Sequence, residues 1–164
     1  MTHDQDEAIE VADEIIITNK GRVEQVGTPF EIYQSPQTAF TASFFGQTSF
    51  VDDYTRFKTF EKIENADKAI VRPEFVKVTK KGEVQKYKSS AAEGIVERTA
   101  FRGNSIELTV RTGDTVLTAK RGLDEQPISA GEKVDVFLYR LFVTSGDKAY
   151  LLENKSLQEN SIVI

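Results

Sequence analysis

Short runs of alternating apolar and polar residues constrain the fold of this chain more than any other feature of its sequence. In segments 106–110 and 134–138, every second residue is Ile, Leu or Val. A period of two residues is typical of strands with one buried face. Glycine-containing turns at 103–104, 112–114 and 145–147 separate such runs. Short strands at this spacing predict a small β-barrel or sandwich in the part of the chain after Gly46.

Residues 1–46 have a different pattern, in which helices alternate with short strands. A helix is predicted over 4–13, because Asp4 and Glu7 have capping-box spacing and apolar residues follow at helical intervals. The three β-branched residues Ile15-Ile16-Ile17 are typical of a strand that is buried on both faces. A glycine turn then leads to a returning strand.

Two further helices are predicted before residue 47. Thr28 is placed as an N-cap with Pro29 at the first helical position and Glu31 at the third, which completes a capping box. This helix must end near Gln34, because a proline follows two residues later. A third helix contains a group of aromatic residues and ends at Gly46: Phe40, Phe44 and Phe45.

The charge of the chain changes at the same place as the pattern. Residues 1–46 contain two basic and eight acidic residues, a net charge of −6. The other 19 basic and 18 acidic residues give 47–164 a net charge of +1. Such a break is typical of two units, so we predict an α/β unit over 1–46 and a β domain over 47–164.

Composition excludes several classes of site. The chain has no cysteine, which excludes disulfides, thiolate catalysis and cysteine-based zinc sites, and its one histidine, His3, excludes a histidine-rich metal site. The sequence pI of 5.1 argues against a dedicated nucleic-acid binder. No apolar run is long enough to span a membrane. The first residues are acidic, unlike a secretory signal, so the cytoplasm is the expected compartment.

Four segments of the first part together resemble the ATPases of ABC transporters. They are the Thr-His-Asp run at 2–8 that opens a helix, the Ala-Asp pair at 12–13, the Thr-Pro segment at 28–36 and Phe44-Phe45-Gly46. The match is continuous over about residues 2–46. It is closest to importer ATPases that have a C-terminal regulatory domain.

A looser resemblance continues in the second part. Val71-Arg72-Pro73-Glu74 and the glycine turn at 101–105 are similar to segments of those regulatory domains, whose fold is a pair of small OB-like β units. The resemblance therefore implies a mainly β chain. An OB-like small-barrel regulatory domain (47–164) would follow an α/β remnant of a nucleotide-binding domain (1–46).

The resemblance implies a catalytic role for His3 as the switch histidine, in contact with the γ-phosphate of ATP and the attacking water. A helix start favours anions, and phosphoryl transfer depends mainly on positioning and electrostatics. ATP and Mg²⁺ would be bound by the parent protein. The sequence has no Gly-Lys dipeptide and no Ser-Gly-Gly-Gln signature. We therefore expect the piece alone to bind no cofactor and to be inactive.

The implied partners are a second copy of the chain, forming a homodimer, and the membrane permease subunits of an importer. The location would be the cytoplasmic face of the membrane, reached through the permeases without a span of its own. The Phe-Phe-Gly ending favours an oxyanion such as sulfate or molybdate as the solute, although maltose-type and polyamine-type importers share most of these motifs. No nucleic-acid partner is expected.

Several other groups of residues have a functional and a structural interpretation. Arg72 and Arg102 could bind an oxyanion or form surface ion pairs, and the structural interpretation is preferred. Segment 139–143 could be a subunit interface or, as we prefer, core. The structural interpretation is also preferred for three charged groups. The basic run is expected to be a solvated strand edge: Lys77, Lys80, Lys81, Lys86 and Lys88. One acidic group is expected to be a solvated helix face (Asp4, Asp6, Glu7 and Glu10), and the pairs Asp52-Asp53 and Asp124-Glu125 are expected to be loop residues.

A second hypothesis of a different class stays open. The chain could be a free-standing OB-like module that binds a small anion or single-stranded nucleic acid. A steep salt dependence of oligonucleotide binding would favour that function. The acidic pI and the long match in residues 2–46 favour the transport ATPase instead.

Overall fold

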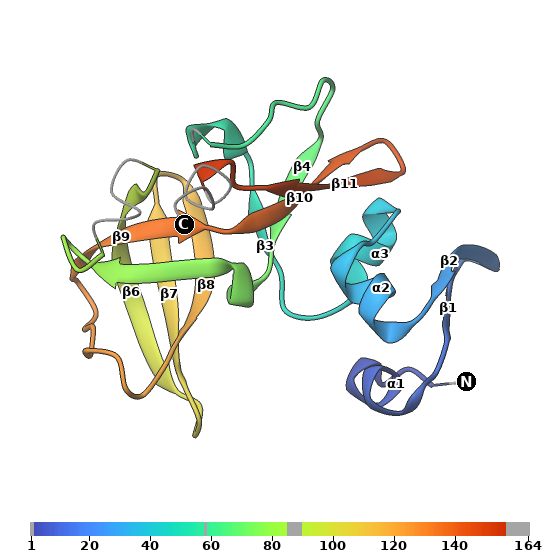
Figure 1. Cartoon of the computed structure of the whole chain (residues 1–164), viewed down its shortest axis with the longest axis horizontal. Coiled ribbons are helices and arrows are strands. Elements are labelled where there is room, and N and C mark those ends of the chain that lie inside the picture. Colours follow the sequence, from blue (N-terminus) through green and yellow to red (C-terminus); the bar gives the residue numbers. More distant parts are fainter. Residues whose placement is uncertain (1, 58, 85–89, 157–164) are drawn as a thin grey trace, which may run out of the picture.

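Three short helices and one hairpin form the first part of the chain in the computed structural model, which describes residues 2–57, 59–84 and 90–156. They follow one another in the predicted order. In Figure 1 they lie together in the blue to cyan part of the colour series, at one end of the molecule. The elements are α1 (Gln5–Val11), β1 (Ile15–Asn19), β2 (Arg22–Gly27), α2 (Pro29–Gln34) and α3 (Ala39–Phe44).

Helix α1 begins at the predicted cap, but only half of the predicted capping box is present. The Asp4 carboxylate accepts hydrogen bonds from the main-chain N–H groups of Asp6 and Glu7, both at 3.1 Å. The Glu7 carboxylate does not return to Asp4. It accepts a hydrogen bond from the Thr2 hydroxyl at 3.1 Å, while the Asp4 N–H donates to that same hydroxyl.

The ends of α2 and α3 confirm the sequence signals. The Glu31 N–H donates to the Thr28 hydroxyl oxygen, and the Thr28 N–H donates to the Glu31 carboxylate at 2.9 Å, so this box is complete. Phe45 is the C-cap of α3 rather than a helical residue. Gly46 follows with a φ of +74°, the left-handed conformation that glycine adopts at least cost.

The described residues after Gly46 form mainly β-strands, with two short 3₁₀ turns, which confirms the mainly β prediction. All strands pair antiparallel within two sheets, ordered β11-β10-β4-β3 and β5-β9-β6-β7-β8. The elements are β3 (Ser49–Val51), η1 (Tyr54–Arg56), β4 (Lys68–Val71), η2 (Pro73–Phe75), β5 (Val76–Lys80), β6 (Ala92–Phe101), β7 (Ile106–Thr112), β8 (Thr115–Arg121), β9 (Lys133–Leu138), β10 (Arg140–Ser145) and β11 (Lys148–Glu153).

The five-stranded sheet curls, so that its first and last strands come close together and form a half-barrel (Figure 1). Alternate side chains of each strand point into this curl, as the period of two residues predicts. The core continues into the four-stranded sheet through Val71, Leu141 and Val143. Fully buried residues at the centre of the curl come from four strands: Val96, Leu108, Val110, Leu117, Ala119, Val134 and Val136.

Helix α3 packs against the four-stranded sheet, which joins the two parts of the chain. Ala42 of the helix shares an apolar cluster with Ile70, Phe75 and Phe142. The segment between α2 and α3 also bonds to the start of β11, because the Ala149 N–H donates to the carbonyl of Gln37 at 3.0 Å. The division into 1–46 and 47–164 stays a prediction.

Segment 139–143 is largely core, as preferred from the sequence. Leu141, Phe142 and Val143 have no exposed surface. Tyr139 and Arg140 are half-buried at the beginning of the same segment. Burial therefore accounts for the aromatic and aliphatic residues here without a partner subunit.

The prediction that Ile15-Ile16-Ile17 is buried on both faces is wrong for the described chain. Ile15 and Ile17 are buried and pack with Ile32 and Phe45, but Ile16 on the opposite face is 60% exposed. Strand β1 pairs only with β2 among the described strands, and no described element buries Ile16 on its second face. The β-branched run is suited to a strand that is buried on both faces, but in this structure only the face with Ile15 and Ile17 is buried.

Candidate functional site

His3 lies one residue before the N-cap of α1 and is exposed. It borders an open hollow of about 810 Å³ between α1, β1 and the end of α3. Ile16 and Phe44 line the same hollow, so its wall is part apolar and part polar. The imidazole is thus accessible at the place where the sequence puts the switch histidine.

The described residues around His3 do not fit a complete nucleotide site. The Asp4 carboxylate already accepts two of the first N–H groups of α1, so this helix start is occupied by an anion of the chain itself. No lysine or arginine borders the hollow among the residues that line it. His3 alone could contact a phosphate, and no catalytic step is derived from this chain.

The acidic groups behave as the structural interpretation predicts, with one exception. Asp4, Asp6, Glu7 and Glu10 lie on exposed positions of α1. Within the described residues, no group of three or more histidine or acidic side chains is arranged to hold a metal ion. The exception is Glu125, which is not a free loop residue but a member of a charged network.

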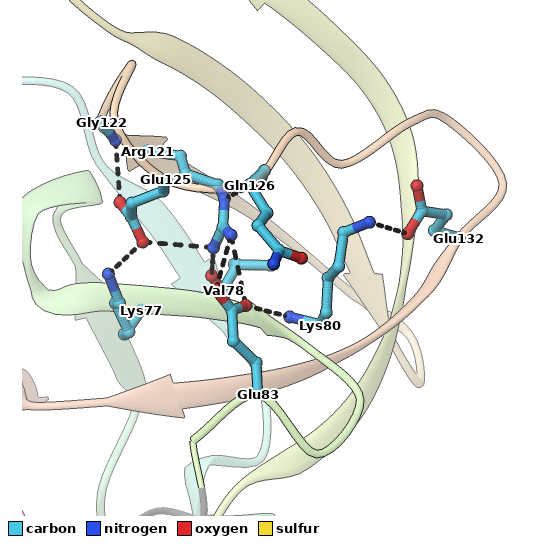
Figure 2. A network of polar contacts seen from close by, with 9 residues as sticks. All are labelled: Lys77, Val78, Lys80, Glu83, Arg121, Gly122, Glu125, Gln126 and Glu132. Carbon is cyan, nitrogen blue, oxygen red and sulfur yellow. Dashed lines mark hydrogen bonds and ion pairs between the residues drawn. The ribbon is translucent and has the colours of Figure 1, made fainter.

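Arg121 is the centre of that network (Figure 2). Its side chain is only 3% exposed. Its Nη1 lies 2.8 Å from the carbonyl oxygen of Val78, and its Nε lies 2.9 Å from the carbonyl oxygen of Gln126. Nη2 bonds to the Glu83 carboxylate at 3.0 Å, and Nη1 lies 3.2 Å from the Glu125 carboxylate. One cation at the end of β8 thus joins β5, the segment after β5 and the segment after β8.

The two carboxylates remain ionised because the network favours their charged forms. Burial alone would raise the pKa of Glu83, but the Lys80 N–H and Arg121 lower it. Burial also raises the pKa of Glu125, but the hydrogen bond from Lys77 at 2.6 Å, the one from the Gly122 N–H and the charges of Lys77 and Arg121 together outweigh it. Both pKa values lie below the ordinary value of 4.5. The positive and negative charges of the network balance. The network therefore stabilises the half-barrel and is not a charged binding site.

The described lysines of the basic run are all ion-paired. The pairs cross to neighbouring segments: Lys77 with Glu125, Lys80 with Glu132, and Lys81 with Glu93 and Asp135. Lys86 and Lys88 lie outside the described residues. The described part of the run is therefore no unpaired basic surface, which favours the structural interpretation over nucleic-acid or phosphate binding.

Arg72 is neither a surface ion pair nor an exposed anion ligand, so both interpretations from the sequence are wrong for it. It has no exposed surface and follows β4, with its guanidinium carbon 3.8 Å from the centre of the Tyr33 ring and 4.9 Å from that of Phe142. Its Nη1 donates to the carbonyl of Tyr33. Arg102, by contrast, forms the predicted surface pair with Glu107 at 2.8 Å.

Sequence reasoning placed Arg72 at the surface and did not single out Arg121, but both are buried. Arg121 ends β8 at a buried position, and Arg72 directly follows the buried residues of β4. The available signal was an arginine in phase with the buried residues of a strand. Because an unpaired cation is very costly to bury, such an arginine indicates a partner elsewhere in the chain. Their partners include Tyr33, Val78 and Glu83, which lie 38 to 43 residues away and carry no local pattern. Glu125 and Gln126 are near Arg121 in the sequence.

Comparison with known families places a TOBE domain in the second part of the chain. The TOBE domain family matches residues 69–138, from β4 to the end of β9. This match contains the whole five-stranded sheet and both buried arginines. Because the TOBE domain is OB-like, the OB-like part of the fold prediction is confirmed.

Curated relatives that share one name match most of this chain: "Spermidine/putrescine import ATP-binding protein PotA". The protein from Clostridium novyi (strain NT) is 35% identical over 70% of this chain, and that from Borrelia garinii subsp. bavariensis is 32% identical over 84%. The protein from Protochlamydia amoebophila is 27% identical over 98%. The matches cover 35%, 41% and 48% of these relatives, so the chain spans less than half of their length.

Proposed function

This chain belongs to the ABC importer ATP-binding proteins that carry a TOBE domain, and from that premise we propose that it is the C-terminal part of a transport ATPase. Residues 1–46 would be the end of the nucleotide-binding domain, and residues 47–164 the β domain that regulates turnover or supports dimerisation. The observation that carries the proposal is the agreement between the motifs at 2–46 and relatives of that name over most of the chain.

The half-covered strand β1 supports this assignment. Ile16, Val23 and Val26 on the hairpin and Val11 on α1 are between 49% and 73% exposed. Burying a large aliphatic side chain is worth about 1.5–3 kcal/mol, so an uncovered group of this kind favours a missing neighbour. In the proposal, the rest of the nucleotide-binding domain covers this face and supplies the phosphate-binding loop, the signature and the Mg²⁺ site.

His3 would act at the γ-phosphate in that larger protein. An exposed imidazole just before a helix can donate a hydrogen bond to a phosphate oxygen or to the attacking water, and one well-placed donor is valuable in phosphoryl transfer. The described surroundings of His3 lack the other groups that ATP and Mg²⁺ require. This chain alone would therefore neither bind ATP tightly nor hydrolyse it.

A polyamine replaces an oxyanion as the proposed solute. The names of the relatives specify spermidine and putrescine, whereas the Phe-Phe-Gly ending was the sole basis for proposing sulfate or molybdate. The proposed partners are a second copy of the ATPase and the permease subunits, which would hold it at the cytoplasmic face of the membrane. None of the helices described here is long and apolar enough to cross a bilayer.

The coding sequence upstream of the Met1 codon tests the proposal first. A Gly-x-x-x-x-Gly-Lys-(Ser/Thr) loop, a Ser-Gly-Gly-Gln signature and an apolar strand ending in two acidic residues are expected there. In the longer protein with its permeases, the His3→Ala variant should lose most ATP hydrolysis and polyamine uptake, while retaining ATP binding. Upstream sequence without these motifs, or ATP hydrolysis by the 164-residue chain that depends on His3, contradicts the proposal.

A further inference from the structure

Helix α2 lacks a stabilising charge of its own at its C-terminal end. It has only six residues, and its last turn contains no basic residue. The last carbonyl groups of a helix lack partners within it and carry partial negative charge, so a nearby cation stabilises them. A helix this short is not stable without tertiary contacts. Its order must therefore come from elsewhere in the fold.

Two arginines from the β part of the chain meet this end of α2. Arg72, between β4 and η2, donates from Nη1 to the carbonyl of Tyr33. Arg140, at the start of β10, donates from Nη1 to the side-chain carbonyl of Gln34 at 3.0 Å. Tyr33 and Gln34 are the last two residues of α2. The positive charge that α2 lacks is thus provided by the four-stranded sheet and the segment that directly follows its strand β4.

Burying the Arg72 guanidinium costs free energy, and its contacts with Tyr33 on α2 offset part of that cost. Nε and Nη2 of Arg72 are buried and have no hydrogen-bond partner among the described residues. Burial lowers the pKa of Arg72, while the nearby Tyr33 and Glu74 oppose that effect. The ring of Tyr33 stacks on the guanidinium, and the Tyr33 hydroxyl donates to Glu74. Away from α2, the cation would lose both the stacked ring and the carbonyl.

We infer that Arg72, with Arg140 beside it, is a clamp that holds α2 on the β domain, so that the two move as one body. Helix α2 in turn contacts α1 and β2, and α1 begins two residues after His3. A displacement of the β4–η2 segment would thereby reach the switch-histidine segment through α2. The clamp itself follows from the contacts above; its regulatory meaning rests on the proposed transport function.

Hydrogen exchange of the 164-residue chain tests the clamp without ATP or permeases. Arg72→Met removes the cation and the donor but keeps most of the volume. Amides of 28–36 should then exchange about tenfold faster, since a hydrogen bond to a charged group is worth about that factor. Amides of the β7–β8 hairpin should be unchanged. Arg140→Met, which also removes the ion pair with Glu153 on β11, should give a smaller effect in the same segment.

Tyr33 variants separate the stack from the hydroxyl. Tyr33→Phe keeps the ring and the carbonyl and should change exchange little. Tyr33→Leu removes the stacked ring but keeps the main-chain carbonyl that Arg72 bonds, so it should accelerate exchange less than Arg72→Met. Added to Arg72→Met, it should give no further acceleration. If Arg72→Met does not fold, Arg72→Lys should give the same local acceleration. Unchanged exchange at 28–36, or acceleration spread equally over the β7–β8 hairpin, overturns the clamp. Either result leaves the transport assignment intact, because that depends on the upstream motifs.

Discussion

The guanidinium of Arg121 on β8 donates a hydrogen bond to the main-chain carbonyl of Val78 on β5, with 2.8 Å between nitrogen and oxygen. Strands β5 and β8 are the two edges of the five-stranded sheet, so this bond closes the curl from inside. Here an arginine side chain joins two strands, whereas main-chain hydrogen bonds join strands elsewhere in the sheet.

Arg121→Met should therefore destabilise the chain by about 3 kcal/mol, the scale measured when one partner of a buried ion pair is removed. The reason is that Glu83 and Glu125 lose their shared cation while they remain partly buried. Urea denaturation followed by circular dichroism measures the change. Arg102→Met, which breaks an exposed pair, is the control and should leave the midpoint unchanged. Equal midpoints for both variants would contradict the assignment.

The same network predicts loss of stability in acid. The pKa values of Glu83 and Glu125 are lowered in the folded state, so their contribution is complete above the ordinary value of 4.5 and disappears as the pH falls through the lower folded values. Urea midpoints measured from neutral pH to about pH 3 should fall most steeply below pH 4.5. The slope should be shallower in Arg121→Met. A variant with the wild-type slope would exclude Arg121 as the cause.

Gly94 on β6 is required by the packing of its neighbours. A Cβ at this position would lie 2.7 Å from Cγ2 of Val136 and 2.8 Å from Cγ1 of Val110, and both valines are fully buried. Gly94→Ala should cost about 1–3 kcal/mol through overpacking. Adding Val136→Ala should recover part of that loss, although Val136→Ala alone is destabilising. Strictly additive effects in thermal denaturation would exclude the steric explanation.

The capping box at the start of α2 predicts a smaller and more local effect. Thr28→Ala removes the acceptor for the Glu31 N–H and should cost about 1 kcal/mol, while Thr28→Ser keeps the hydroxyl and should cost much less. Exchange of the amides of 28–36 reports the local change, and urea denaturation reports the total. Similar losses in the two variants would mean that the methyl group, and not the cap, is the important part of Thr28.

Tyr33 should ionise only in strongly alkaline solution. Burial, together with the hydrogen bond to Glu74 and the charge of that carboxylate, raises the pKa of its phenol to about 12. Ultraviolet titration of the wild type minus that of Tyr33→Phe isolates this one phenol. The difference should titrate near pH 12. A midpoint at the ordinary value of 10.0 would show that the ring is not held against Arg72 and Glu74 in solution.

The sequence by itself determined the local elements and the family. Helix caps, turns and strand alternation depend on residues within a few positions of one another, so Thr28, Gly46 and the runs at 106–110 and 134–138 were placed correctly. The motifs at 2–46 likewise identified the family before any contact was known. His3 as a catalytic residue stays a prediction.

Only the tertiary structure decided which charged and apolar residues are covered. Arg72 and Arg121 are buried with the help of partners 38 to 43 residues away, and Ile16 is exposed because no described element packs on its face of the β1–β2 hairpin. A local pattern indicates that a side chain is suited to burial, but it does not indicate which distant segment packs against it. That outcome is set by the curl of one sheet and the docking of α2 and α3 on the other, both of which depend on contacts between distant parts of the chain.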